Sequence, residues 1–383
     1  MQISSPPSIA AETSCMFSSV AKVQALFRQR QQAPRILIVR NDGLGDLILT
    51  LPLVSALRAQ FPQAVLYLLC DRNLAPLAQM LPALDGVVED PGVLLKRHAG
   101  RMTPALRQAG RQRLREELRH LNFDLAIFAY AESPSAALIQ ATGIPWRLGP
   151  LRRRFFWRFN LWATASRKGS AKAEWEMNLD LLSVLGLPMA YHPPQLALPA
   201  LDPPAASLLA ASAGYVVLHP YKRAATALSW PLEHFLSLAQ AFLAQGLEVV
   251  AVGDAADAPV LEATFAALPQ VRLLTGLALP QLAALLAGAK LFVGNSSGPL
   301  HLAGLVGTPH VGFFPQNRVS APARWRTLPN PQAPQAYQTY LRQPAFPRAC
   351  ITCAGPSCPY YNCVAAISLQ EALEAAQSWL SPK

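Results

Sequence analysis

The sequence predicts an α/β protein made of two doubly wound domains, and three observations support this prediction. The chain has 383 residues, which is long enough for two domains of ordinary size. Its composition is 52% hydrophobic and only 14% charged, which supplies ample core and argues against disorder. Short apolar runs alternate with helical patterns along both halves, as expected of parallel sheets covered by helices.

The first half begins with a polar, proline-containing N-terminal extension, 1–33. Four short apolar runs then predict buried parallel strands at 36–39, 65–69, 87–88 and 125–128. A turn at 41–46 leads into a helix that ends near 61, and a basic helix is expected over 104–121. We expect these elements to form a first domain over 34–195.

A proline-rich stretch around 188–207 is the candidate linker. Apolar runs beyond it predict five strands, at 215–218, 248–252, 271–274, 291–293 and 311–314, of which the last ends the series. Helical patterns follow at 231–243, 279–287 and 369–380. We expect a second domain over 205–345 and a separate C-terminal segment over 346–383. Two Rossmann-like domains with an interdomain cleft describe the GT-B arrangement, in which ligands bind at the carboxyl ends of strands.

The most informative stretch is 293–303, which follows an apolar run and opens a predicted helix. Its small residues expose backbone N–H groups at a helix N-terminus, and such an end attracts anions. His301 lies on the first turn behind it. The pattern predicts a site for a negatively charged group such as a diphosphate, with an ordinary glycine-rich turn as the alternative.

Positive charge is concentrated in the first half of the chain. The net charge is +11, and residues 96–172 hold 16 basic and 4 acidic residues. Arg152, Arg153 and Arg154 stand directly before a run of aromatic residues. Nucleic acid, anionic lipid or a phosphorylated glycolipid would fit this charge, and a solvated basic face is the alternative. Because no recognisable nucleic-acid module accompanies the patch, we expect no nucleic-acid partner.

Neither a membrane span nor a secretory signal is expected. No run of about 18 apolar residues exists, and the N-terminus lacks a basic region followed by an apolar core. We therefore expect a cytoplasmic protein, with peripheral contact to a membrane surface left open.

Four of the six cysteines lie close together, at Cys350, Cys353, Cys358 and Cys363. In a cytosolic protein such clustering favours a zinc or iron site over a disulfide framework. A closed four-thiolate site leaves no open coordination position, so we expect a structural role. Free thiols and disulfides remain the alternatives.

Two motifs resemble glycosyltransferase family 9, the bacterial heptosyltransferases that build the inner core of lipopolysaccharide. The first is Arg40-Asn41-Asp42-Gly43-Leu44-Gly45-Asp46, followed by Thr50-Leu51-Pro52. The second is 294–303, followed by Gly307-Thr308-Pro309. The resemblance implies a GT-B fold and inverting transfer of a sugar, with no cofactor required for the chemistry. It further implies ADP-heptose as the donor and a lipopolysaccharide core as the acceptor, at the cytoplasmic face of the inner membrane.

The resemblance also implies roles for individual residues. Asp46 becomes the general base that deprotonates the acceptor hydroxyl, with a helix N-cap as its structural alternative. The donor diphosphate is expected at the second motif, at Gly294, Ser296, Ser297, Gly298, Pro299 and His301, with a core-facing first-turn histidine as the alternative for His301. Asp254 follows a strand and suits the nucleotide ribose, with a loop or cap role as its alternative. The acceptor is expected on the first domain, at Asn41, Asp42, Arg152, Arg153 and Arg154.

Two positions depart from the family pattern. Ser296 stands where the family commonly has an aspartate that contacts the donor sugar, and Leu228 where it commonly has a phosphate-binding lysine. Lys222, Arg223 and Thr226 are expected to bind the donor instead. The departures leave the donor sugar open and motivate one alternative, a non-catalytic sugar-nucleotide or glycolipid-binding protein. The other alternative is a protein acceptor, because protein-modifying heptosyltransferases hold iron in a similar cysteine cluster.

Overall fold

The computed structural model describes residues 33–95, 102–164, 172–207, 214–221, 228–330 and 362–380, with shorter pieces at 21, 23, 25, 100, 167, 338–341, 350, 353 and 355–359. The chain divides into two compact units. Unit 1 comprises Met1–Arg167 and Trp175–Pro194, and unit 2 comprises Lys168–Glu174 and Gln195–Lys383.

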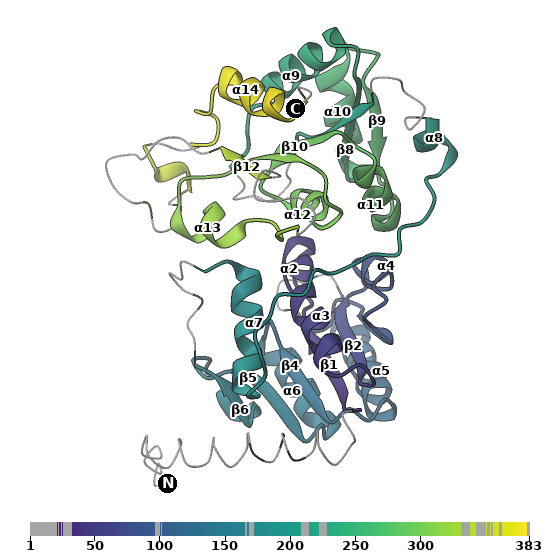
Figure 1. The fold of residues 1–383 in the computed structure, drawn as a ribbon. Coiled ribbons are helices and arrows are strands. Elements are labelled where there is room, and N and C mark those ends of the chain that lie inside the picture. The colour runs from purple at the N-terminus through teal and green to yellow at the C-terminus, as the bar shows by residue number, and fades with distance from the viewer. Residues whose placement is uncertain are drawn as a thin grey trace. The chain divides into compact units, whose positions relative to one another are not determined.

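Unit 1 contains a parallel sheet with the strand order β3-β2-β1-β4-β5-β6 (Figure 1). Its strands are β1 (Arg35–Val39), β2 (Val65–Asp71), β3 (Gly86–Asp90), β4 (Leu125–Phe128), β5 (Trp146–Pro150) and β6 (Leu161–Ala163). Its helices are α2 (Leu44–Ile48), α3 (Leu51–Gln60), α4 (Ala75–Ala78), α5 (Pro104–His120), α6 (Ser133–Thr142) and α7 (Glu174–Val184).

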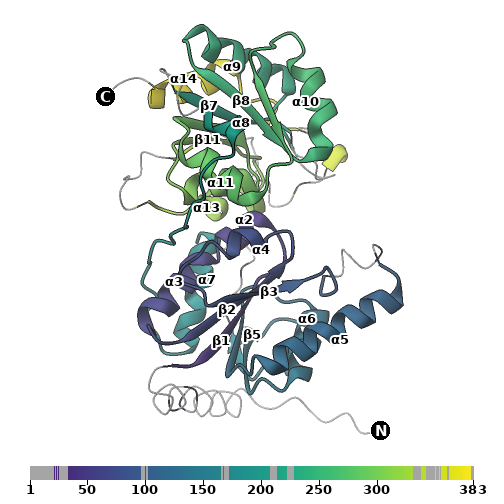
Figure 2. The same cartoon turned by 90° about the vertical axis from the view of Figure 1, so that its right-hand side faces the viewer.

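The central strand β1 explains how unit 1 is layered. Residues 36–39 are fully buried, because helices cover both faces of the sheet. Leu37 and Val39 belong to one apolar cluster with side chains of α5 and α6, such as Leu118 and Ile139. Helices α3 and α7 cover the opposite face (Figure 2). The polar residues after β1 therefore lie at the carboxyl end of a central strand in a well-packed sheet.

Unit 2 repeats the topology, with the strand order β12-β11-β10-β7-β8-β9. Its strands are β7 (Tyr215–His219), β8 (Glu248–Gly253), β9 (Arg272–Thr275), β10 (Leu291–Asn295), β11 (His310–Phe313) and β12 (Gln338–Leu341). Its helices are α8 (Pro203–Ala206), α9 (Leu232–Ala244), α10 (Ala258–Phe265), α11 (Leu279–Ala287), α12 (Gly298–Leu305), α13 (Pro322–Trp325) and α14 (Leu369–Leu380).

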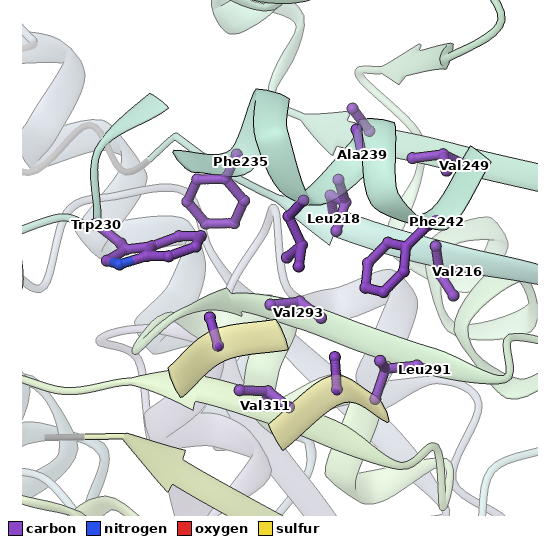
Figure 3. Packing of buried hydrophobic residues seen from close by; sticks show 14 of the residues in the cluster. Val216, Leu218, Trp230, Phe235, Ala239, Phe242, Val249, Leu291, Val293 and Val311 are labelled. Atoms are coloured by element: carbon purple, nitrogen blue, oxygen red, sulfur yellow. The ribbon is translucent and has the colours of Figure 1, made fainter. Parts of the chain in front are cut away.

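Trp230 is the largest fully buried side chain of the described residues, and it lies in the core of unit 2 (Figure 3). Its ring stacks on Phe313 at a centroid distance of 4.2 Å and meets Phe235 edge to face. Its indole Nε1 donates a hydrogen bond to the carbonyl of Ile367 at 2.8 Å. Ala372 of α14 belongs to the same cluster. The final helix is thus part of the core of unit 2.

The expected strands recur within about two residues, but the structure has more of them. The expectation that 311–314 ends the series is wrong, because β12 pairs in parallel with β11, His310 opposite Gln338. Strands β5 and β6 also lay outside the prediction, as did helices α6, α7 and α10. Among the described helices, none has the length and apolar character needed to cross a membrane. In the N-terminal extension only Ala21, Val23 and Ala25 are described, and Val23 is buried.

Candidate active site

Each sheet reverses its strand order at one place, between β1 and β4 in unit 1 and between β7 and β10 in unit 2. In doubly wound folds, ligands bind outside the carboxyl ends of the strands at such a reversal. Both sequence motifs lie there, because 40–46 follows β1 and 296–303 follows β10. The topology therefore gives each unit one candidate ligand site.

Arg40 holds the carboxylates of the candidate site in unit 1. Its side chain is only 2% exposed, and its Nε donates to Oδ1 of Asp42 at 2.7 Å. Its Nη2 donates to Oδ2 of Asp42 at 3.1 Å and also to Oδ1 of Asp46. Its Nη1 reaches the carbonyl of Ala129 beyond β4, at 3.3 Å. A buried guanidinium needs such partners because its desolvation is costly, so Arg40 fixes both carboxylates against the sheet.

Asp46 lies in the first turn of α2 and is 26% exposed. It does not cap the helix, because Gly43 occupies the N-cap position without a side-chain hydrogen bond. A Cβ atom on Gly43 would lie 3.0 Å from Oδ2 of Asp46, so the glycine makes room for the carboxylate. Asn178 of α7 donates to the carbonyl of Leu49 at 2.8 Å and secures the turn behind Asp46. The cap alternative for Asp46 is therefore wrong, and its carboxylate is held by Arg40 instead.

The side chains of Asn41 and Asp42 both bond to other residues of unit 1. Asn41 is fully buried, and its Nδ2 donates to Oδ2 of Asp90 at 3.0 Å. Burial raises the pKa of Asp90, and the hydrogen bonds from Asn41, Val93 and Gly92 oppose that rise. The carboxylate of Asp42 is 11% exposed and engaged by Arg40. This burial argues against the acceptor contact expected of the Asn41 side chain.

Arg152, Arg153 and Arg154 are all exposed, on the connection between β5 and β6. Arg153 acts electrostatically on Tyr130, the residue two positions after β4. The pKa of Tyr130 is raised to about 12, first by burial and then by Glu132, and Arg153 opposes this rise. Tyr130 also receives the Arg40 guanidinium over its ring, 5.8 Å from the centroid. Sequence reasoning missed Tyr130, whose only signal is its place just beyond a strand.

In unit 2, His219 and Ser297 meet across the reversal between β7 and β10. Oγ of Ser297 lies 3.3 Å from Nδ1 of His219 and donates to the carbonyl of Asn295 at 2.9 Å. The buried amide of Asn295 accepts from the backbone N–H of Trp230 at 2.8 Å and donates to the carbonyl of Pro220 at 3.0 Å. These bonds fix the carboxyl ends of both strands. Sequence reasoning did not select His219, although it ends a buried strand.

Helix α12 begins where the sequence predicts an anion site, with Ser297 at its N-cap. Its N-cap Ser297 makes no side-chain capping hydrogen bond, so its hydroxyl does not occupy the amides of the first turn. His301 is 3% exposed and lies edge to face with Trp325 of α13, with 6.3 Å between the ring centroids. Gly294 is buried in β10, where a Cβ would press on Phe292 and His219. Ser296, Gly298 and Pro299 are partly exposed at the helix start.

The remaining donor residues differ in their surroundings. Asp254 and Asp257 form a capping box, in which the backbone N–H of Asp254 donates to Oδ2 of Asp257 at 2.8 Å. The cap alternative for Asp254 is therefore realised, although its side chain is exposed. Leu228 is buried in the core of unit 2. Lys222, Arg223 and Thr226 lie outside the described residues.

None of the four C-terminal cysteines forms a disulfide bond in the described part of the chain. The pKa of Cys350 is raised by burial and by the negative charge of the other three, Cys353, Cys358 and Cys363. Backbone N–H groups of Gly355 and Gln316 donate to the sulfurs of Cys353 and Cys363 at 3.3 and 3.4 Å. In the described part of the chain, no three cysteine, histidine or acidic side chains converge as metal ligands do.

Comparison with known proteins relates this chain to one family. The model of glycosyltransferase family 9 (heptosyltransferase) matches residues 111–353. Lipopolysaccharide heptosyltransferase 2 of Escherichia coli K12 is 26% identical over 306 residues, which cover 73% of this chain and 82% of the relative.

Two solved structures share the fold. A family 9 glycosyl transferase from Veillonella parvula has a TM-score of 0.71 at 19% identity, over 91% of this chain and 97% of that one. The E. coli heptosyltransferase WaaC with ADP-2-deoxy-2-fluoro heptose has a TM-score of 0.65 at 19% identity, over 90% and 99%. These likenesses establish the GT-B fold class. Because the family model spans more than half of the sequence, this chain belongs to glycosyltransferase family 9 and is a glycosyltransferase.

Proposed function

We propose that the protein transfers heptose from ADP-heptose to a lipopolysaccharide core acceptor with inversion at the anomeric carbon. The observation that carries the proposal is the carboxylate of Asp46, which Arg40 holds at the strand-order reversal of unit 1. The second support is the anion site of unit 2 at the corresponding reversal. Similarity to proteins named lipopolysaccharide heptosyltransferases favours this donor and this acceptor class.

Asp46 is the proposed general base. As the acceptor hydroxyl attacks the anomeric carbon, its proton moves to the carboxylate of Asp46. The new bond joins the acceptor oxygen to the sugar, and the bond between the sugar and the nucleotide diphosphate breaks. Arg40 orients the base because it binds one carboxylate oxygen and is itself anchored to Asp42. The reaction needs no metal ion in this scheme.

Unit 2 is the proposed donor site. The backbone N–H groups at the start of α12 would stabilise the departing diphosphate, with Ser297, Gly298 and His301 beside them. His219 holds the Ser297 hydroxyl and is a positioning residue in this scheme. The other proposed donor contacts are Gly294, Ser296, Pro299, Asp254, Lys222, Arg223 and Thr226.

Unit 1 is the proposed acceptor site. Arg153 lies within electrostatic reach of Tyr130, which contacts Arg40. Arginine binds phosphate bidentately, so the three arginines 152–154 suit the phosphates of a lipopolysaccharide core. Such an acceptor is membrane-embedded, and we place the protein at the cytoplasmic face of the inner membrane.

Substitution of the base tests the proposal. We expect Asp46→Asn to lower kcat by about 10² to 10⁴, with ADP-heptose and a core acceptor as substrates. Asp202→Asn is the matched control, because Asp202 is an exposed aspartate at the start of α8 that the proposed reaction does not use. Full turnover by Asp46→Asn would exclude the base assignment. Donor binding without hydrolysis or transfer by the wild type would favour the non-catalytic alternative.

The donor sugar requires its own test, because Ser296 stands at a position where the family commonly has an aspartate. Mass spectrometry of the nucleotide sugar retained by the purified protein would identify it. Recovery of a hexose nucleotide instead of ADP-heptose would overturn the donor assignment while leaving the reaction class intact.

We also propose a structural zinc or iron site at Cys350, Cys353, Cys358 and Cys363. Two of these sulfurs accept backbone N–H hydrogen bonds, a common support of metal-bound thiolates. The thiols would have to move together, since they do not converge as ligands among the described residues. Elemental analysis should find one metal per chain, and a Cys353→Ser/Cys358→Ser variant should lose it. Bound iron together with transfer to a polypeptide would favour the protein-acceptor alternative.

A further inference from the structure

The connection between β5 and β6 exposes two large aromatic side chains that the glycosyl-transfer site does not use. We call residues 151–158 the aromatic turn; it ends in the 3₁₀ helix η2 (Phe156–Arg158). Phe156 is 41% exposed and Trp157 is 59% exposed. Their rings form an edge-to-face pair with centroids 5.9 Å apart. In the part of the chain that the structure describes, no other large exposed hydrophobic residues are neighbours in sequence.

The aromatic turn is firmly anchored beneath these rings. Phe159 is 2% exposed and packs so closely on Gly149 that a Cβ there would lie 2.4 Å from its ring. Nε1 of Trp162 donates to the carbonyl of Phe156 at 3.2 Å, and Nε of Arg147 donates to the carbonyl of Arg158 at 2.8 Å. The sheet thus holds the turn so that Phe156 and Trp157 stay in solvent. Two adjacent exposed rings on a fixed backbone are typical of a surface that binds an apolar partner.

The surrounding charge identifies the chemistry of that partner. The stretch from Ser133 to Ala173 contains eight Lys and Arg residues and no Asp or Glu. Three of the eight, Arg152, Arg153 and Arg154, are exposed next to the aromatic pair. Tryptophan and phenylalanine favour the headgroup region of a bilayer, and anionic headgroups attract clustered arginine. An anionic membrane surface offers both properties at once.

We propose that the aromatic turn docks unit 1 on an anionic membrane, with Phe156 and Trp157 in the headgroup region and the arginines against lipid phosphates. The docking surface lies in the same unit as the proposed base, and Arg153 links it electrostatically to Tyr130 at the carboxyl end of β4. It rests on the proposed function only for the expectation that the acceptor is membrane-embedded. Binding is measured without donor or acceptor, so the two proposals fail separately.

Vesicle sedimentation of the full chain tests the docking. We expect binding to vesicles of phosphatidylcholine mixed with phosphatidylglycerol, and little binding to phosphatidylcholine alone. Phe156→Ser/Trp157→Ser should weaken the partition about 10-fold or more, and Arg152→Gln/Arg153→Gln/Arg154→Gln about 100-fold. Met189→Ser is the matched control, because Met189 is a 50% exposed apolar residue elsewhere in unit 1. Unchanged partition of the aromatic variant, or no binding by the wild type, would overturn the proposal.

A second measurement separates membrane docking from recognition of the acceptor. Bromine-labelled lipid should quench wild-type tryptophan fluorescence more than that of Trp157→Phe, which should still bind vesicles. With a lipid-free core oligosaccharide as acceptor, Phe156→Ser/Trp157→Ser should keep the wild-type KM. A raised KM with unchanged vesicle binding would show that the aromatic pair forms an acceptor subsite instead, and the proposal would be wrong.

Discussion

Gly43→Ala measures how tightly the site constrains the proposed base. Gly43 has φ −118° and ψ 163°, an extended conformation that alanine adopts without strain. The added Cβ would lie 3.0 Å from Oδ2 of Asp46, and contacts below 3.4 Å are tighter than nine in ten real ones. The carboxylate therefore has to move by a few tenths of an ångström.

The carboxylate cannot yield without disturbing its partners. Arg40 holds its Oδ1 and is in turn bonded to Asp42 and to the carbonyl of Ala129. A displacement of about 1 Å costs a reaction roughly 100-fold, so a displacement of about 0.4 Å corresponds to about a 6-fold lower kcat. The fold should change little. Alanine is a poorer N-cap than glycine, but its lower unfolded-state entropy contributes about 0.4–1 kcal/mol in the opposite direction.

Initial rates of ADP release at saturating donor and acceptor would give kcat, and urea unfolding would give the stability. Gly100→Ala is the matched control, because no heavy atom lies within 4 Å of its added Cβ. We expect the control to keep the wild-type kcat. A Gly43→Ala enzyme with full kcat and wild-type stability would refute the view that Asp46 acts from this position.

Three further predictions concern stability. Arg40→Gln leaves the carboxylates of Asp42 and Asp46 without their guanidinium, so urea unfolding should show a loss of about 3–5 kcal/mol, and Arg40→Lys a smaller one. Burial lowers the pKa of His310 from 6.5 to about 4. The neutral His310 side chain therefore contributes fully to the free energy of unfolding above pH 6.5. This contribution, roughly 3 kcal/mol in all, is lost as the pH falls from 6.5 through 4. His310→Asn should flatten urea-unfolding stability across that window, and an unchanged slope would contradict the assignment. Leu228→Lys places an ammonium in the core of unit 2, so thermal melting should show a clear fall in Tm without tighter donor binding.

Burial explains which strands the sequence predicts. Strands β1 and β7 lie inside their sheets, are almost wholly buried, and therefore consist of continuous apolar runs. Strand β12 is an edge strand whose four residues, Gln-Thr-Tyr-Leu, are all partly exposed. Strand β5 is Trp-Arg-Leu-Gly-Pro, with an arginine and both common strand breakers. Such strands carry no periodic hydrophobic signal, so they can be assigned only when their neighbours are known.

The candidate site likewise has residues that the sequence predicts and partners that it does not. Residues 40–46 and 294–303 are contiguous, and their helix-opening glycines and polar residues are visible in the sequence. The partners come from the neighbouring strands, because His219 meets Ser297 from 78 residues away and Ala129 meets Arg40 from 89 residues away. The inward direction of Asn41 likewise depends on Asp90 of β3. These contacts follow from strand order, and local patterns do not encode strand order.

In the proposed scheme the two units bind anions by different means, and Leu228 shows why. A lysine is common in the family at this position, but here a leucine fills the core beside Trp230. Residues 196–383 hold ten Lys and Arg against eight Asp and Glu, whereas residues 96–172 hold 16 against 4. The proposed anion site of unit 2 would therefore rely heavily on backbone N–H groups at the start of α12, and their attraction for an anion depends on fixed geometry. Asn295 and His219 supply that geometry through their bonds to Trp230, Pro220 and Ser297. Unit 1 carries exposed positive charge at Arg152, Arg153 and Arg154, which would act over distance on a large anionic partner.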